Sequence, residues 1–136
     1  MTFDLSKILR PNIAALTPYS SARDEFSGEA SIYLDANENP FNTGHNRYPD
    51  PMQWEVKKKW AAIKNIDKEN ILFGNGSDEV IDLIIRAFCE PKEDNVIILP
   101  PTYGMYEVYS NINNVEIKKV SLTQDFQLDV PAILNA

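Results

Sequence analysis

The sequence predicts an α/β fold in which the strands pair in parallel. The prediction rests on the order of the patterned segments, because strand, helix, strand, helix and strand follow one another between residues 71 and 120. Strands are expected at residues 71–73, 95–99 and 115–120, where short apolar runs are bounded by polar or turn residues. Such an alternation is typical of right-handed crossovers, and ligands then bind beyond the carboxyl ends of the strands.

The helices are predicted from capping residues and apolar spacing. One helix is expected to begin with Asp50 as its N-cap and Pro51 as its first residue. The apolar residues that follow at helical spacing predict one buried stripe, formed by Met52, Val56, Trp60 and Ile63. Residues 78–89 are apolar around most of a helical circumference, so this helix should be packed on several sides. Residues 102–112 predict an aromatic-rich helix.

The two ends of the chain differ in character. Residues 1–30 lack sustained periodicity and are expected to form an extended arm with at most a short helix near residues 5–9. A short strand is expected at residues 31–34, before a loop rich in Asn, Gly and Pro. Another helix begins near residue 129, so the sequence looks cut short. We therefore expect an arm over residues 1–30 and the beginning of a larger domain over residues 31–136.

Composition excludes several classes of protein. With 136 residues, 43% hydrophobic and 24% charged, the chain is typical of one globular domain. It has no apolar run of membrane-spanning length and no signal-peptide pattern, so we expect a cytoplasmic location without a membrane partner. The net charge of −7 argues against a nucleic-acid partner. The one cysteine, Cys89, is expected to be a buried thiol, and no metal site is expected.

The turn that precedes the helix near Ser77 is the best single candidate for a binding site. An apolar run ends there at Gly74 and Gly76, which allow a tight turn and a close approach of the backbone to a ligand. The first N–H groups of the helix have no intrahelical partner, and phosphate is their natural ligand. The turn lacks the lysine of a Walker loop and the third glycine of a dinucleotide fingerprint. Considered alone, it is equally compatible with an ordinary strand-to-helix connection.

Five short strings together resemble the histidinol-phosphate aminotransferases, which are fold-type I pyridoxal-phosphate (PLP) enzymes. In the order of that family they are LTPY at 16–19, LDANENP at 34–40, RYPD at 47–50, GNGSDE at 74–79 and PTYGMY at 101–106. The resemblance implies a three-layer αβα architecture with a mostly parallel sheet, of which this chain covers the amino-terminal part. It also implies a homodimer that interconverts histidinol phosphate and 2-oxoglutarate with imidazole acetol phosphate and glutamate.

The resemblance assigns the cofactor contacts to Gly76, Ser77, Asp78, Tyr103 and Tyr48. Backbone N–H groups of residues 76–78 would bind the PLP phosphate, and the ring of Tyr103 would stack on the pyridine ring. The hydroxyl of Tyr48 would reach the phosphate held by the other subunit. The carboxylates of Asp78 and Glu79 would repel a phosphate, so we expect them to point away from it and only their amides to contribute.

The same resemblance places two residues on the substrate side. Tyr19 would close over the substrate entrance, and Asn37 would offer an amide to the substrate carboxylate. Asn37 and Glu38 precede a proline, so turn chemistry remains an alternative for both. His45, between Gly44 and Asn46, is expected at the surface, and Tyr106 and Tyr109 are expected to serve packing.

Essential catalytic groups of the family are not expected within these 136 residues. The lysine that forms an imine with PLP, the acid facing the pyridine nitrogen and the arginine for the substrate carboxylate all lie later in the family's sequence. None of the nine lysines present has the small-residue context of that lysine, so no catalytic residue is assigned and these residues alone should be inactive. Three alternatives stay open: a threonine-phosphate decarboxylase, a non-catalytic phosphate- or nucleotide-binding module, and a folding or assembly fragment without a ligand.

Overall fold

The computed structural model describes residues 4–28 and 30–136, so residues 1–3 and 29 of the expected arm lie outside the described residues. The chain divides into two compact units. We call Met1–Leu16 together with Phe73–Ala136 the sheet unit, and Thr17–Leu72 the loop unit. Each unit is described by itself below.

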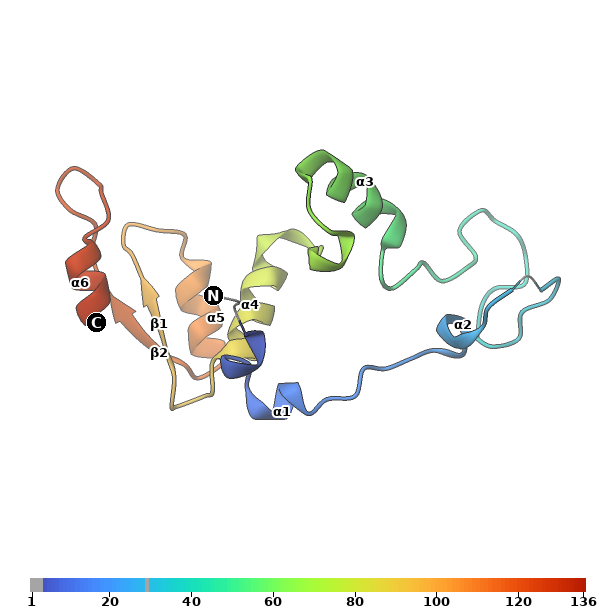
Figure 1. Cartoon of the computed structure of the whole chain (residues 1–136), viewed down its shortest axis with the longest axis horizontal. Helices are drawn as coiled ribbons and strands as arrows, with labels where there is room; N and C mark the ends of the chain where they lie inside the picture. The colour runs from blue at the N-terminus through green and yellow to red at the C-terminus, as the bar shows by residue number, and fades with distance from the viewer. Residues whose placement is uncertain (1–3, 29) are drawn as a thin grey trace. The chain divides into compact units, whose positions relative to one another are not determined.

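The sheet unit is built around a strand, helix, strand crossover. Strand β1 (Asn95–Ile98) pairs in parallel with β2 (Glu116–Lys119), and helix α5 (Met105–Ile112) connects them (Figure 1). This pairing confirms the predicted α/β class and two of the predicted strands to within about a residue at each end. The core includes Ile85, Ile98 and Val115, which are 4–5% exposed.

Further helical segments belong to the sheet unit. Helix α4 (Gly76–Phe88) packs against α5. Leu83 and Ile84 are 41% and 51% exposed, so the helix is not packed on all the sides that its apolar circumference predicts. The short elements are η1 (Leu5–Lys7), α1 (Pro11–Ala14) and α6 (Val130–Asn135). Arg10, just before α1, pairs with Glu90 at 2.9 Å and donates from its guanidinium to the carbonyl of Arg86, also at 2.9 Å. The beginning of the expected arm is therefore attached to the end of α4.

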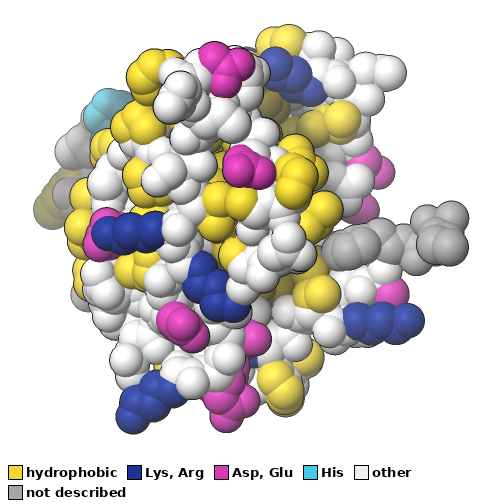
Figure 2. Space-filling model, turned by 90° about the vertical axis from the view of Figure 1, so that its left-hand side faces the viewer, with side chains coloured by type: hydrophobic (Ala, Val, Ile, Leu, Met, Phe, Trp, Pro, Cys, Tyr) yellow, Lys and Arg dark blue, Asp and Glu magenta, His cyan; other side chains and the backbone are white. Residues whose placement is uncertain are grey.

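Apolar side chains also reach the surface of the sheet unit. Figure 2 shows hydrophobic side chains between charged ones on the face that it views. Among the described residues of this unit, the most exposed large apolar side chains are Leu134 at 80% and Phe126 at 70%. No helix in the described part of the chain is long and apolar enough to cross a membrane.

The loop unit contains helices α2 (Ala22–Glu25), α3 (Trp54–Lys64) and η2 (Lys68–Asn70). Helix α3 begins later than predicted, because the Asp50 carboxylate accepts hydrogen bonds from the N–H groups of Met52 and Trp54, both at 2.8 Å, and holds a separate turn there. Gln53, the N-cap, has a φ of 57°, which interrupts the helix at that point.

The predicted buried stripe on α3 is wrong. Val56, Trp60 and Ile63 are 42–70% exposed. The buried side chain of α3 is instead that of Lys57, which is 8% exposed and has its Nζ 5.2 Å from the centre of the Trp54 ring. The long methylene stem of a lysine can be buried in this way beside an aromatic ring.

Two predicted strands, residues 31–34 and 71–73, are also wrong. Ile71 has the extended angles φ −117° and ψ 127°, so its local conformation agrees with the prediction. A strand also needs a hydrogen-bonded neighbour, and within the described residues the sheet consists of β1 and β2 alone. The sequence pattern therefore predicted an extended backbone without being able to supply its partner.

Candidate functional site

The turn before α4 depends on two glycines for different reasons. Gly76 has a φ of +78°, a conformation that side-chain-bearing residues rarely adopt, and an added Cβ there would meet no atom within 4 Å. Gly74 is required for space, because a Cβ there would lie 2.7 Å from a methyl carbon of Val80. The turn thus combines a left-handed residue facing open space with a tightly packed one.

The amino-terminal end of α4 is available to an anion. Asn75, the N-cap, makes no side-chain capping hydrogen bond, and the first N–H groups of a helix have no intrahelical partner. Glu79 folds back and its carboxylate accepts hydrogen bonds from the backbone N–H of Asn75 and, at 3.0 Å, from its side-chain amide. The Glu79 carboxylate is thus bonded to Asn75 and not to the N–H groups of residues 76–78, which lie at the positive end of the helix.

Tyr103 lies beside this helix end. Its hydroxyl donates a hydrogen bond to Asp78 Oδ1 at 3.2 Å, and its ring packs edge-on against Tyr106 at 6.3 Å between centres. The side chain is 54% exposed. The pKa of the Tyr103 hydroxyl is raised chiefly by desolvation and then by the hydrogen bond to Asp78. The hydroxyl therefore stays protonated and able to donate. Within the sheet unit the structure therefore brings together Asp78 and Tyr103, two of the predicted site residues.

A polar clamp fixes α4 against α5 behind this site. Asn113, the C-cap of α5, donates from Nδ2 to Asp82 Oδ1 at 2.8 Å and to the carbonyl of Tyr109 at 2.9 Å. Asp82 also pairs with Arg86 at 2.8 Å. The hydrogen bond from Asn113, and then the one from Arg86, hold the pKa of Asp82 below its ordinary value. Sequence reasoning missed Asn113, since an asparagine after a helix is ordinarily read as a local cap.

The remaining predicted residues belong to the loop unit. Tyr19 and Tyr48 line a cavity of about 720 Å³, together with Asp35, Glu38 and Asp50. Asn37 lines a smaller pocket of about 260 Å³ that shares Glu38 and Tyr48 with the first. Tyr19 is 91% and Tyr48 65% exposed, so both hydroxyls are open to a ligand.

Asn37 is part of a turn, as the alternative interpretation required. The N–H of Glu38 donates to the carbonyl of Ala36 at 2.9 Å and closes a three-residue turn with Asn37 at its centre. Asn39 Oδ1 accepts from the N–H of Phe41 at 3.0 Å. Because the turn uses the backbone of Asn37, it leaves open a ligand role for the side-chain amide.

The sequence suggested turn chemistry for Glu38, whereas the structure gives its buried side chain an ion pair. Its side chain is 4% exposed and pairs through Oε2 with Arg47 at 2.6 Å. Its Oε1 accepts a hydrogen bond from the backbone N–H of Tyr48 at 2.8 Å. The strings around residues 38 and 47 contained both partners, but their pairing depends on the course of the loop between them.

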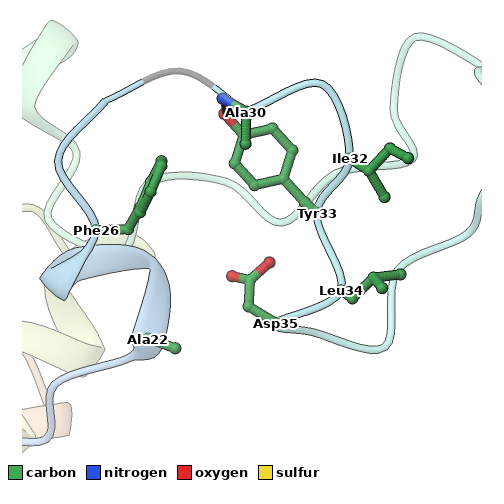
Figure 3. Close-up of a pocket in the computed structure, with 7 residues that line it drawn as sticks. All are labelled: Ala22, Phe26, Ala30, Ile32, Tyr33, Leu34 and Asp35. Atoms are coloured by element: carbon green, nitrogen blue, oxygen red, sulfur yellow. Dashed lines mark hydrogen bonds between the residues drawn. The ribbon is translucent and has the colours of Figure 1, made fainter.

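A third pocket of about 200 Å³ lies beside the extended segment at residues 31–34. Figure 3 shows Tyr33 and Asp35 pointing to one side of this segment and Ile32 and Leu34 to the other, the alternation expected of a strand. Phe26 contacts Tyr33 edge-on with ring centres 6.4 Å apart. None of the predicted site residues lines this pocket, which is mainly apolar.

The sequence has one histidine and one cysteine. His45 is exposed, as predicted, and lines the 260 Å³ pocket that also contains Asn37. Cys89, predicted to be a buried thiol, is half-buried, and burial raises the pKa of its thiol, which therefore stays protonated. Among the residues that the structure describes, no group of three His, Cys, Asp or Glu side chains could hold a metal ion.

Comparison with known proteins gives the class of protein first. The profile of the family described as "Aminotransferase class I and II" matches residues 32–136, and the chain belongs to this family. More particularly, it is similar to proteins named histidinol-phosphate aminotransferase. It is 59% identical to that of Parabacteroides distasonis over 133 residues, which are 98% of this chain and 39% of the relative. It is 57% identical to that of Bacteroides thetaiotaomicron over 97% of this chain and 38% of the relative.

A third relative of the same name, from Christiangramia forsetii, is 59% identical over 98% of this chain and 39% of its own length. These matches confirm the resemblance on which the sequence analysis relied. The chain spans about two fifths of the length of these relatives. Their shared name favours an aminotransferase over the threonine-phosphate decarboxylase alternative.

Proposed function

We propose that this chain provides the phosphate-binding turn and the ring-stacking tyrosine of a PLP-dependent aminotransferase. The substrates would be histidinol phosphate and 2-oxoglutarate, and the products imidazole acetol phosphate and glutamate. The observation that carries the proposal is the position of Tyr103, whose hydroxyl contacts Asp78 at the uncapped end of α4. The names of the relatives support the choice of reaction.

The residues present fit the cofactor. Backbone N–H groups of residues 76–78 offer donors and a positive helix end to a phosphate, and the space beside Gly76 is open. The half-exposed ring of Tyr103 offers a face for a planar ring and would exclude water from it. When bound, PLP supplies an aldehyde and an electron-withdrawing ring, through which an amino group can be exchanged between two substrates.

Asp78 has a defined part in this arrangement. Its carboxylate would repel a phosphate, but it accepts a hydrogen bond from the Tyr103 hydroxyl and so helps to hold the ring in place. Its backbone N–H lies in the first turn of α4 and keeps the orientation that this turn gives it. The residue would therefore bind phosphate through its amide and orient Tyr103 through its side chain.

The predicted residues of the loop unit would have roles of their own. The Tyr48 hydroxyl would donate to the phosphate held by the partner subunit of a cytoplasmic homodimer. Tyr19 would close over the substrate, and the amide of Asn37 would bind its carboxylate. In the domain plan we propose, residues 1–30 form an arm and residues 31–136 belong to the large PLP-binding domain.

No lysine of this chain is assigned to proton transfer. In the sheet unit, Lys119 pairs with Glu107 at 2.8 Å and Lys118 donates to the carbonyl of Ala136. Residues 1–136 expressed alone should therefore produce no glutamate from histidinol phosphate and 2-oxoglutarate. The rest of the catalytic machinery would have to come from outside these residues.

The test is a titration of the polypeptide that carries residues 1–136 with PLP, followed by its visible absorbance. Gly76→Ala should weaken binding about tenfold, because a positive φ costs alanine roughly 1–2 kcal/mol. Gly104→Ala is the matched control, since an added Cβ there meets no atom within 4 Å and no positive φ is involved. A polypeptide that binds no PLP, or that tolerates both variants equally, would contradict the proposal. Release of CO₂ from threonine phosphate would instead favour the decarboxylase.

A further inference from the structure

Two predicted ligand residues of the loop unit, Asn37 and Tyr48, line one pocket together with Glu38. Asn37 precedes Glu38 in the sequence, and the backbone N–H of Tyr48 donates to the Glu38 carboxylate. Glu38 also lines both the 720 Å³ cavity and the 260 Å³ pocket. A carboxylate in this place could act on both residues without contacting a ligand.

The burial of Glu38 indicates a specific role. A carboxylate that is 4% exposed is costly unless its oxygens are paired. Oε2 pairs with the Arg47 guanidinium at 2.6 Å, and Oε1 accepts the Tyr48 N–H at 2.8 Å. Hydrogen bonds to a charged acceptor are stronger than those between neutral groups, so the two contacts fix the start of the segment that carries Tyr48.

Neighbouring contacts support the same fold of the loop. Asn46 Nδ2 donates to the carbonyl of Asn39 at 3.1 Å, which joins the same two segments a second time. The guanidinium of Arg47 lies 5.8 Å from the centre of the Tyr33 ring, a cation–π contact. Arg47 therefore has two partners, the Tyr33 ring and the Glu38 carboxylate, and Glu38 connects it to the backbone of Tyr48.

We infer that Glu38 is a positioning residue that holds Tyr48 and Asn37 for ligand binding through its contacts with Arg47 and the Tyr48 N–H. This inference rests on the proposed function, because it concerns residues of that site. Glu38 itself would contact neither phosphate nor substrate. Loss of its carboxylate should therefore weaken ligand binding only as far as Tyr48 and Asn37 contribute to it.

The first test measures the backbone directly and needs no ligand. In the ¹⁵N-labelled polypeptide that carries residues 1–136, hydrogen exchange of the Tyr48 N–H should become about tenfold faster or more in Glu38→Ala. Glu55→Gln is the matched control, because Glu55 is an exposed carboxylate of the same unit that pairs with Lys58 at 2.9 Å. A Tyr48 N–H that exchanges freely in the parent, or equally in parent and Glu38→Ala, would overturn the inference.

The second test asks whether Glu38 acts through Tyr48. The dissociation constant for PLP is measured for Glu38→Ala, Tyr48→Phe and the double variant, and each single change should raise it about tenfold. If Glu38 positions Tyr48, the double variant should also be about tenfold weaker. A hundredfold loss would mean independent effects and would overturn the inference.

Two further outcomes are decisive. If Glu38→Ala fails to fold, as judged by circular dichroism, Glu38→Gln takes its place in the same cycle. Its amide can still accept from Tyr48 but loses the ion pair with Arg47, so a smaller effect with the same non-additivity is expected. If the parent binds no PLP, the proposed function fails, while the exchange rate of the Tyr48 N–H still decides whether Glu38 positions that segment.

Discussion

In the sheet unit Ile85, Ile98 and Val115 are at most 5% exposed, whereas among the described residues of the loop unit the most buried apolar side chain, Ile71, is 9% exposed. Leu34 and Tyr19 in the loop unit are 91% exposed. The first unit is thus held by apolar packing around a parallel strand pair. The second has many apolar residues but hardly any apolar core.

Short side chains bonded to nearby backbone take the place of a core in the loop unit. Carboxylate or amide oxygens accept from N–H groups two residues later at Asn39, Asn42, Asp50 and Asp67. Each such bond contributes about 1 kcal/mol and fixes only a few residues. The sheet unit thus derives its stability from contacts distant in sequence, whereas the loop unit derives its shape from local ones.

The largest expected effect contrasts two aliphatic truncations. Ile85→Ala should lower the free energy of unfolding by about 2–4 kcal/mol, because it leaves a cavity in the sheet unit. Leu34→Ala should change it by less than about 0.5 kcal/mol, since exposed side chains contribute little. Urea denaturation of both variants measures the difference. Equal losses would mean that Leu34 is buried in solution, which would contradict the difference in apolar burial between the two units.

A smaller effect is expected at the turn before α4. Gly74→Ala should cost about 1–3 kcal/mol, because its Cβ would lie 2.7 Å from Val80 Cγ2 and the packing must shift. Gly104→Ala, where a Cβ meets no atom within 4 Å, should be nearly neutral. Thermal unfolding of both variants compares a packed glycine with an unpacked one. A neutral Gly74→Ala would show that the turn is looser than described.

The polar clamp between α4 and α5 should show a pH dependence. Asn113→Ala should cost about 1–2 kcal/mol at neutral pH, because it removes a donor to the Asp82 carboxylate. The pKa of Asp82 is below its ordinary 3.8 in the folded state, so its contribution is present above that pH and is lost as the pH falls through the lower folded value. Unfolding free energies of parent and Asn113→Ala should therefore converge in acid. If the difference between the two unfolding free energies stays constant with pH, the hydrogen bond from Asn113 to Asp82 is not its cause.

The smallest effect is expected on the exposed face of α3. Glu55→Gln removes an ion pair with Lys58 in which the Glu55 side chain is 84% exposed. Solvent and salt screen such pairs, so no change in the unfolding midpoint should be detectable. A measurable loss at low salt would mean that surface charge contributes to the stability of the loop unit.

Sequence patterns predicted the sheet unit well because its signals are periodic and mutually consistent. The apolar circumference of α4 and the runs at β1 and β2 each have one favourable structural outcome. In the loop unit the same reasoning predicted a buried stripe on α3 and a strand at residues 31–34. Both need a partner surface, which a local pattern cannot specify. The late start of α3 has the same origin, since Asp50 caps a separate turn with the chemistry of a helix cap.

The candidate site likewise has parts that the sequence predicted and parts that it did not. The glycine turn at residues 74–76 was recognisable from residue type and spacing, whereas Tyr103 was assigned from the resemblance to the aminotransferase family. Other contacts of the site join residues that are distant in sequence or lie across a loop. They are the hydrogen bond between Tyr103 and Asp78, the one between Asn113 and Asp82, and the ion pair of Glu38 with Arg47. Such pairs depend on the folded backbone and leave no local signal.

The most direct test of the central claim maps PLP onto the backbone. Amide chemical shifts of the ¹⁵N-labelled polypeptide that carries residues 1–136 are recorded during a titration with PLP, with inorganic phosphate as the reference ligand. We expect the amides of Gly76, Ser77 and Asp78 to shift with both ligands, and that of Tyr103 to shift with PLP alone because only PLP carries a ring. Saturable shifts confined to other residues, with the amides of 76–78 unchanged, would contradict the account.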